Sequence, residues 1–344
     1  MSTSPRLELT REQILAFRRT AAGLEERLAP GPASLRRAAW AGLQDSMPRA
    51  ALLSLHARVA GIRPDAWEDH ALIQVWGPRF SAYVIAANDR AVFTLGRLPD
   101  DAKGRRFAQE TADRLEGFLD GRRMSYAVAG HGLGLNPNAL RYTAPTGRVL
   151  IRWEGARLPT IWTVAAPQMD PGAARLELAR RYLHIFGPTT AESFARWAGI
   201  ALAGGRAAFA ALGSALLPVS TPLGAAWILA ADEAAFRQAA AATAPARLLP
   251  SGDAYWLLKG RDRELLVPDP ERRSQLWTPR VWPGALLIGG EIAGIWRRAA
   301  ANVTVETWRQ LSPAERRAVE AEAAALPLPD VYGQCRVTVV TASR

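Results

Sequence analysis

Three polar side chains stand together between two apolar helical segments, at Gln44, Asp45 and Ser46. These residue types can support hydrolysis, because a glutamine amide can orient a water molecule and a carboxylate can act as a base or stabilise positive charge. In an extended backbone Gln44 and Ser46 share one face and Asp45 faces the other, whereas in a turn all three can converge. A competing interpretation needs no chemistry: Asp45 or Ser46 caps the helix that begins at Pro48, and the pattern alone favours it.

Other reactive or ligating side chains do not form a recognisable site in the sequence. The four histidines lack the spacing of a metal-binding helix motif, and they stand at His56, His70, His131 and His184. The single cysteine, Cys335, excludes an intramolecular disulfide and a cysteine-based zinc site. Gly130 to Gly134 follows no clear strand and lacks a downstream Lys-Ser/Thr, so we interpret it as a loop rather than a phosphate cradle. We therefore expect no metal and no cofactor.

The charge balance points to a polyanionic partner. The chain has 344 residues with Lys+Arg 43 against Asp+Glu 32, a formal net charge of +11. Lysine occurs only at Lys103 and Lys259, so nearly all of the positive charge is arginine. A GC-rich genome explains the choice of arginine over lysine but not the excess of positive charge. The surplus favours nucleic acid as a partner, and an anionic membrane surface second.

One segment is long enough to raise the question of a membrane span. Residues 207–231 carry no charge, which covers the ~20 residues that a bilayer requires. Pro218, Pro222 and Gly224 interrupt the segment at its middle, which predicts two short elements joined by a turn. The first nine residues contain no apolar stretch of the kind found in a signal peptide. We therefore expect a cytoplasmic protein that does not associate with membranes.

The first hundred residues predict three helices and a β-hairpin. Thr10 and Gln13 can form a capping box for a first helix, which ends before Pro30-Gly31-Pro32. Two further helices and two short strands follow, at 35–43, from Pro48 onward, at 71–76 and at 80–85. Three helices followed by a hairpin are typical of a winged helix, a variant of the helix-turn-helix.

This outline recurs twice as a pattern, although the residues themselves do not repeat. The second round has helices and a hairpin at 104–119, 124–130, 136–142, 148–153 and 157–164. The third has a helix between Asp170-Pro171 and Gly187-Pro188, then helices and strands at 189–198, 205–212, 216–220 and 226–230.

The character of the chain changes after Pro250. Short β-like runs are interrupted by turn signals, at 255–258, 264–267, 285–288, 292–296 and 336–341, and one helix is predicted over 312–325. The expected fold is therefore α+β, with three tandem winged-helix modules and a C-terminal β-barrel-like domain. The expected boundaries are 1–100, 101–168, 169–250 and 251–344.

Several segments resemble one known family. The run from Trp40 to Gln44 and the following Pro48 to Arg58 are similar to the winged-helix DNA-binding proteins related to bacterial interstrand-crosslink and alkylpurine DNA glycosylases, the AlkZ-like family. Residues 146–155, 184–190 and 290–297 extend the resemblance over most of the chain. It implies three tandem winged helices around a C-terminal β-barrel, which agrees with the outline above. It also implies removal of N7-alkylated purines and unhooking of crosslinks, often as self-resistance to genotoxic natural products.

The resemblance locates a candidate catalytic motif, and this chain departs from it. The family motif is Gln-x-Gln, or Gln-x-Asp in a sister branch; Gln44 matches its first position, whereas Ser46 matches neither branch and Asp45 replaces an apolar residue. In a second family pattern, Trp-x-x-Arg-Gly-Thr-x-His, Trp76 and Arg79 are retained and the later positions differ. Gln44, Asp45 and Ser46 are therefore the candidate catalytic residues.

Five arginines are the candidate DNA-binding residues, and two classes of function remain open. Arg49 and Arg79 lie in segments that carry the resemblance, and Arg141, Arg148 and Arg152 flank the expected recognition helix and wing of the second module. The first hypothesis is a monofunctional DNA glycosylase, a monomer acting on alkylated or crosslinked double-stranded DNA. The second is a non-catalytic DNA-binding protein, a regulator or lesion sensor, which the altered motif favours. A function unrelated to DNA is a third, weaker alternative.

Overall fold

Side-chain caps determine where several helices begin. Thr10 and Gln13 form the predicted capping box of α1 (Arg11–Ala21), and Ser312 and Glu315 form a second box at α13 (Pro313–Ala324). Asp101 caps α5 (Ala102–Leu119) by accepting a hydrogen bond from the Gly104 amide. The computed structural model describes residues 7–45, 47, 49–154, 158–238, 241–244, 246–328 and 335–341.

The strands between residues 43 and 163 form a single six-stranded sheet rather than two separate hairpins. Its order is β2-β4-β3-β6-β7-β5, and β3 joins β6 through the pairing of Gln74 with Ile151. The strands are β2 (Leu43–Gln44), β3 (Leu72–Trp76), β4 (Ala82–Ala86), β5 (Met124–Ser125), β6 (Val149–Arg152) and β7 (Thr160–Thr163). The surrounding helices are α2 (Pro32–Ala38), α3 (Ala50–Arg58), α4 (Arg90–Thr94), α5, α6 (Tyr126–Gly132) and the 3-10 helix η5 (Pro137–Thr146). Gln44 therefore lies at one edge of a sheet that spans the first two predicted modules.

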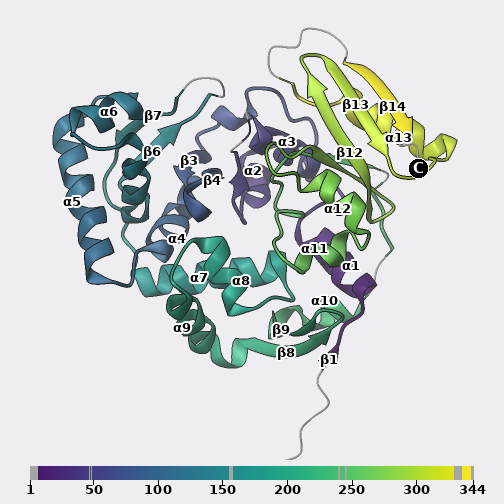
Figure 1. The fold of residues 1–344 in the computed structure, drawn as a ribbon, viewed down its shortest axis with the longest axis horizontal. Coiled ribbons are helices and arrows are strands. Elements are labelled where there is room, and N and C mark those ends of the chain that lie inside the picture. The colour runs from purple at the N-terminus through teal and green to yellow at the C-terminus, as the bar shows by residue number, and fades with distance from the viewer. Residues whose placement is uncertain are drawn as a thin grey trace, which may run out of the picture.

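The charge-free segment forms a helix end and a hairpin, as its interrupting residues predict. In Figure 1 this part of the chain lies opposite the C-terminal strands. Strands β8 (Leu216–Thr221) and β9 (Gly224–Leu229) pair with each other, and β1 (Leu7–Glu8) adds to them in parallel. The helices of this region are α7 (Pro171–Phe186), α8 (Ala191–Ala198), α9 (Leu202–Leu212) and α10 (Glu233–Arg237). Among the described residues, no helix has the length and apolar character that crossing a membrane requires.

The C-terminal strands form an open sheet, which corrects the expectation of a β-barrel-like domain. Its order is β10-β11-β12-β13-β14, and the two end strands do not pair with each other. The strands are β10 (Arg247–Leu249), β11 (Gly284–Ile288), β12 (Glu291–Ala299), β13 (Asn302–Thr307) and β14 (Arg336–Thr341), with α13 packed against β10 and β14. Five strands without a pairing between first and last cannot close.

Two strands predicted after Pro250 are absent from the described residues. Residues 255–258 run through a turn and an irregular segment, and 264–267 fall mainly in α11 (Asp262–Leu266), which precedes α12 (Pro270–Leu276). Their buried apolar parts are short, four residues at 255–258 and three at 265–267 after the exposed Glu264, and such a run satisfies a helix, a strand or a buried loop equally well. Periodicity therefore could not assign them.

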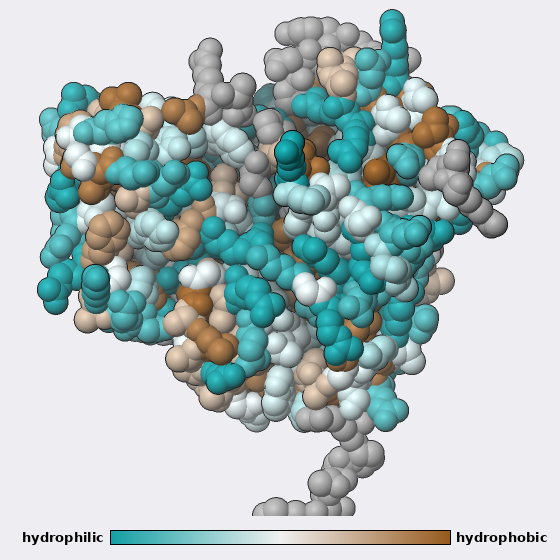
Figure 2. All heavy atoms as spheres, in the orientation of Figure 1, coloured by the Kyte–Doolittle hydropathy of each residue, from teal (hydrophilic) through white to brown (hydrophobic). Residues whose placement is uncertain are grey.

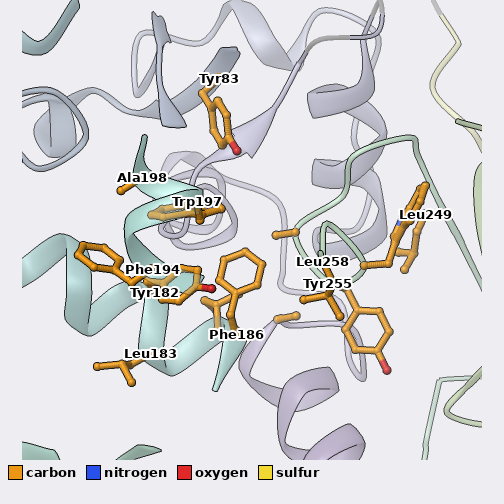
Figure 3. Packing of buried hydrophobic residues seen from close by; sticks show 14 of the residues in the cluster. Tyr83, Tyr182, Leu183, Phe186, Phe194, Trp197, Ala198, Leu249, Tyr255 and Leu258 are labelled. Carbon is orange, nitrogen blue, oxygen red and sulfur yellow. The ribbon is translucent and has the colours of Figure 1, made fainter. Parts of the chain in front are cut away.

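The main hydrophobic core joins segments that the sequence assigns to different modules. Figure 3 shows Tyr83 of β4 near Trp197 of α8, with Tyr182 of α7 and Leu258 of the loop before α11 in the same cluster. Trp197 and Tyr182 have ring centroids 5.0 Å apart. The edge of the six-stranded sheet is thereby packed against both α8 and the chain that follows Pro250.

A buried ion pair ties α3 to the same loop region. Arg58 of α3 donates to both carboxylate oxygens of Asp253, at 2.7 and 2.9 Å, and the Ser54 hydroxyl donates to Asp253 at 2.6 Å. The Asp253 side chain is fully buried, and Arg58 lowers the pKa of this carboxyl although burial opposes it. Each charge therefore depends on its partner.

Replacing Arg58 is expected to destabilise the fold strongly. Arg58→Ala leaves the Asp253 carboxylate buried without its main partner, so the free energy of unfolding should fall by about 3–5 kcal/mol. The exposed pair of Arg63 and Asp65 provides a control, because Arg63→Ala should cost less than about 1 kcal/mol. Chemical denaturation of the three proteins measures both differences, and an equal loss in the two variants would contradict the assignment.

Candidate active site around Gln44

Gln44 occupies the end of β2, where the strand pairs with Tyr83 of β4. Its amide oxygen Oε1 accepts a hydrogen bond from Arg79 Nη2 at 3.0 Å, and the Tyr83 hydroxyl lies 3.5 Å from the same oxygen. Gly252 approaches from the opposite side, where an added Cβ would lie 3.2 Å from Gln44 Nε2. Two residues that the sequence places 35 positions apart, Gln44 and Arg79, are therefore in direct contact.

An unusual turn between β3 and β4 presents Arg79 to Gln44. Arg79 and Phe80 both have left-handed backbone conformations, with φ of 55° and 56°. Such conformations cost of order 1–3 kcal/mol in non-glycine residues and persist where the surroundings enforce them. Here the turn packs on α8, and a Cβ at Gly199 would lie 3.2 Å from the Arg79 nitrogen. The buried Arg97 also braces it, donating to the Trp76 and Ala198 carbonyls at 2.9 and 2.7 Å.

The Gln44 side chain faces a pocket of about 400 Å³. This volume lies in the range of about 300–1,000 Å³ that is usual for small-ligand sites. Half-buried Trp282 forms one wall, and exposed Arg280 lies at its rim. The remaining lining residues come from the chain after β2, from the β3–β4 turn and from the segments 251–257 and around 281: Met47, Arg79, Ser81, Ser251, Leu257 and Val281. The pocket therefore combines a planar aromatic surface, hydroxyl groups and two guanidinium groups next to the Gln44 amide.

Asp45 points away from this pocket and caps α3 from within the core. Only 2% of the residue is exposed. Its Oδ1 accepts a hydrogen bond from the Ala51 amide at 3.0 Å, and Oδ2 accepts one from Gln74 Nε2 at 2.7 Å. The opposite directions of Gln44 and Asp45 follow from the alternation of side chains along an extended backbone. These contacts agree with the capping interpretation of Asp45, but α3 begins at Ala50 with Arg49 as its N-cap residue, so Asp45 caps the helix from outside the N-cap position.

The network around Asp45 continues into the β6–β7 hairpin. Gln74 accepts a hydrogen bond from the Trp153 amide at 2.7 Å, and Arg49 donates to the Trp153 carbonyl at 3.0 Å. Arg49 also lies 4.0 Å from the Asp45 carboxylate. The residues that fix the end of β2 therefore also hold the hairpin where β6 ends and its connecting loop begins. The sequence did not single out Gln74, although a glutamine at a buried strand position is a signal of such a network.

The five arginines proposed to contact DNA lie in different settings. Arg49 and Arg152 stack on the Trp67 ring, each with its guanidinium carbon 3.6 Å from the ring centroid. Arg152 is a third exposed and pairs with Glu68 at 3.1 Å. Arg79 lines the Gln44 pocket, as described above.

The two remaining arginines lie on the second module and do not line the Gln44 pocket. Arg148 forms ion pairs with both Asp113 and Glu116 of α5 and is largely buried. Its guanidinium is therefore engaged within the protein. Arg141 lies in η5, half-buried, and its Nε has no hydrogen-bond partner among the described residues. Ser46, the third candidate catalytic residue, lies outside the described residues.

A larger cavity of about 640 Å³ lies away from Gln44 and Arg79. It is lined by parts of α1, α2, α3 and α7, including Trp40, Leu43 and His184. Leu43 lines this larger cavity, whereas Gln44 lines the smaller pocket. Because adjacent residues of β2 point to opposite sides, the two cavities lie on opposite sides of this strand. No group of three or more histidine, cysteine or acidic side chains suited to a metal ion occurs in the described part of the chain.

The buried position of Asp45 predicts a pH-dependent stability. Burial raises the pKa of this carboxyl from 3.8 to about 7, against the opposing effects of Ala51, Arg49 and Gln74. Between about pH 4 and 7 the folded protein holds a proton that the unfolded chain has released, so this contribution to stability is lost as the pH rises toward 7. Asp45→Asn lacks the titration. The stability of the wild type relative to the variant should therefore fall by a few kcal/mol from about pH 4 to about pH 8, because each tenfold change in proton activity is worth roughly 1.4 kcal/mol.

Denaturation curves of wild type and Asp45→Asn at several pH values measure this difference. Asp65→Asn, which removes an exposed carboxyl, is the matched control. A difference between wild type and Asp45→Asn that stays constant with pH would show that Asp45 does not titrate in this way.

Comparison with known proteins places the chain in a family. The model of the family described as DNA glycosylase AlkZ-like matches residues 37–327. Among solved structures, the chain is similar to the Streptomyces sahachiroi DNA glycosylase AlkZ, at 20% sequence identity and a TM-score of 0.77, over 98% of this chain and 100% of that one. No curated protein matches. Since the family model spans most of the sequence, including Gln44, Asp45 and Arg79, the chain belongs to the AlkZ-like DNA glycosylase family.

Proposed function

We propose that the protein is a monofunctional DNA glycosylase that removes an N7-alkylated purine or unhooks a crosslink, with Gln44 as its catalytic residue. The observation that carries the proposal is the Gln44 amide, which faces a pocket of about 400 Å³ beside Arg79 in a chain of this family. The substrate is double-stranded DNA carrying the lesion, and the protein acts as a monomer.

The proposed reaction makes modest demands on the site. Alkylation at N7 gives the purine a positive charge, so the electron pair of the breaking N-glycosidic bond neutralises the departing base. Water adds to C1′ of the sugar and loses a proton to solvent. The Gln44 carbonyl oxygen accepts a hydrogen bond from this water and orients it, which is a role suited to an uncharged amide.

The pocket lining suits an extruded purine. A glycosylase must take its target base out of the helical stack, and an aromatic side chain compensates part of the lost stacking. Trp282 supplies such a surface, and its indole donates to the Thr278 carbonyl at 2.9 Å, which fixes the ring. Ser81 and Ser251 add hydroxyl groups that can hydrogen-bond the edge of a base.

In this proposal Asp45 positions Gln44 and does not touch the substrate. Its carboxylate oxygens are engaged by Ala51 and Gln74. Its backbone amide also donates to the Ala82 carbonyl at 2.8 Å, which continues the pairing of β2 with β4. Ser46 is the remaining candidate for a direct contact with the water or the sugar.

We also propose that the three helix-and-sheet units are winged helices with boundaries near residues 100, 168 and 250. The order of elements supports this assignment, since helices precede β3–β4, β6–β7 and β8–β9 in turn. The shared six-stranded sheet fixes the first two units relative to each other. Arg152 on the second hairpin, exposed in part, is then a candidate contact to the DNA backbone.

A second candidate function is DNA binding without catalysis, as a regulator or lesion sensor. One observation favours it: no acidic side chain lines the Gln44 pocket within the part of the chain that the structure describes. A carboxylate near the reacting sugar would stabilise positive charge in the transition state. The two candidates differ in whether base release occurs at all.

Replacement of Gln44 tests the glycosylase proposal. Gln44→Ala should lower the single-turnover rate of base release from duplex DNA containing N7-methylguanine by about 100-fold or more, because the attacking water loses its orienting group. Binding of the same duplex should change little, since the side chain is uncharged. Gln109→Ala, which removes an exposed glutamine of α5, is the matched control and should retain the wild-type rate.

Two results would contradict the proposal. Base release by Gln44→Ala at the wild-type rate would remove Gln44 from the mechanism. Binding of DNA by the wild type, with no release of base from either N7-methylguanine or crosslinked duplexes, would favour the non-catalytic candidate.

A further inference from the structure

Several exposed arginines of this protein form ion pairs with a carboxylate on the same helix or on a neighbouring one. Examples are Arg206 with Glu192 at 3.0 Å and Arg237 with Glu233 at 2.6 Å. Such pairing leaves little free positive charge at those places. A net charge of +11 nevertheless requires that some cations lie apart from carboxylates.

Four cationic side chains beside the Gln44 pocket lie apart in this way. None of Arg79, Arg196, Lys259 and Arg263 has a carboxylate oxygen within 4.0 Å among the described residues. They come from three segments: the β3–β4 turn, α8, and the residues around the start of α11. We refer to these four residues as the basic cluster.

The members of the basic cluster are close enough to repel one another. Arg79, Arg196 and Lys259 line one small pocket together. The pKa of Lys259 is lowered by partial burial first and then by the charges of Arg79, Arg196 and Arg263. A fold that gathers like charges carries a Coulomb penalty, and an anionic ligand removes that penalty when it binds.

One carboxyl lies in the same pocket, and it only partly offsets the cluster. Asp262 is half-buried, and burial raises its pKa, while Arg18 and Arg196 act in the opposite direction. Arg18 itself is buried and donates to the carbonyls of Phe186 and Gly187, so it does not reach a ligand in this pocket. The excess of positive charge remains.

Arg79 connects the basic cluster with the candidate active site, because it lines both pockets. Its Nη2 donates to Gln44, whereas its Nε is buried and has no hydrogen-bond partner among the described residues. Arg263 makes a second connection, since its guanidinium lies 5.4 Å from the ring centroid of Trp282 in the Gln44 pocket. An anion at the cluster would therefore lie next to a group bound in the Gln44 pocket.

We propose that Arg79, Arg196, Lys259 and Arg263 bind a backbone phosphate of the DNA strand that carries the target nucleotide, adjacent to that nucleotide. This inference rests on the proposed function and adds the path of the substrate strand, across the N-terminal end of α11 and over α8. Figure 2 shows hydrophilic residues over the centre of this face, where Figure 1 places α8 and α11. Lys259 and Arg196 are exposed, so a phosphate can reach them.

The salt dependence of DNA binding tests this site. The probe is a short duplex with one tetrahydrofuran abasic-site analogue, which has no base to release. The affinity for DNA falls as the salt concentration rises, and each phosphate contact that is lost makes the slope of log affinity against log salt concentration less steep by about one. Because both residues contact the same phosphate in this proposal, the double variant Arg196→Gln/Lys259→Gln should make the slope less steep by about one, and weaken binding most at low salt. Both residues are exposed, so the variant should keep its fold.

The charge-matched control is Arg206→Gln/Arg237→Gln, which removes two exposed arginines elsewhere on the protein. Its slope should stay at the wild-type value. A wild-type slope in the cluster variant, or an equal reduction in the control, would overturn the proposed phosphate site. The probe has no base at the lesion position, so the measured slope does not depend on catalysis. An absence of base release in separate assays would therefore contradict the glycosylase proposal without affecting the test of the phosphate site.

Discussion

The buried carboxylate of Asp45 constrains the geometry of the whole candidate site. A carboxylate removed from water needs hydrogen-bond donors, and Asp45 obtains them from Ala51 at the start of α3 and from Gln74 of β3. These bonds fix the direction of the backbone at the end of β2. Because adjacent residues of an extended chain point to opposite sides, they also turn Gln44 toward Arg79 and the pocket. The same network reaches Trp153, so the β6–β7 hairpin is held relative to Gln44.

Arginines serve two distinct purposes in this chain. Several act as internal connectors: Arg58 pairs with Asp253 inside the core, and the buried Arg97 joins the β3–β4 turn to α8 through backbone carbonyls. Other arginines, such as Arg196, lie exposed beside the Gln44 pocket without a carboxylate partner among the residues that the structure describes, and Lys259 lies there in the same way. The net charge counts both kinds equally. Only the arrangement in space separates charge that holds the fold together from charge that is available to a phosphate.

The sequence predicted the local elements and the family more fully than the site. The capping box at Thr10, the helix near 312–325 and the hairpin in the charge-free segment follow from short-range patterns, and the structure confirms them. The contact between Gln44 and Arg79 depends on strand register and on a left-handed turn that no local pattern indicates. The pairing of Arg148 with α5 and the joining of two hairpins into one sheet are likewise long-range. The prediction of a barrel-like domain was wrong because strand count does not determine closure.

The central claim is that Gln44 acts on the substrate, whereas Asp45 holds Gln44 in position and does not contact the substrate. Single-turnover base release from N7-methylguanine duplex by Gln44→Ala and by Asp45→Asn, each corrected for its folded fraction, tests this claim most directly. The account predicts that Asp45→Asn keeps its rate within about tenfold of wild type, while Gln44→Ala loses about 100-fold or more. A folded Asp45→Asn protein that is as inactive as Gln44→Ala would contradict it, because Asp45 would then take part in the chemistry itself.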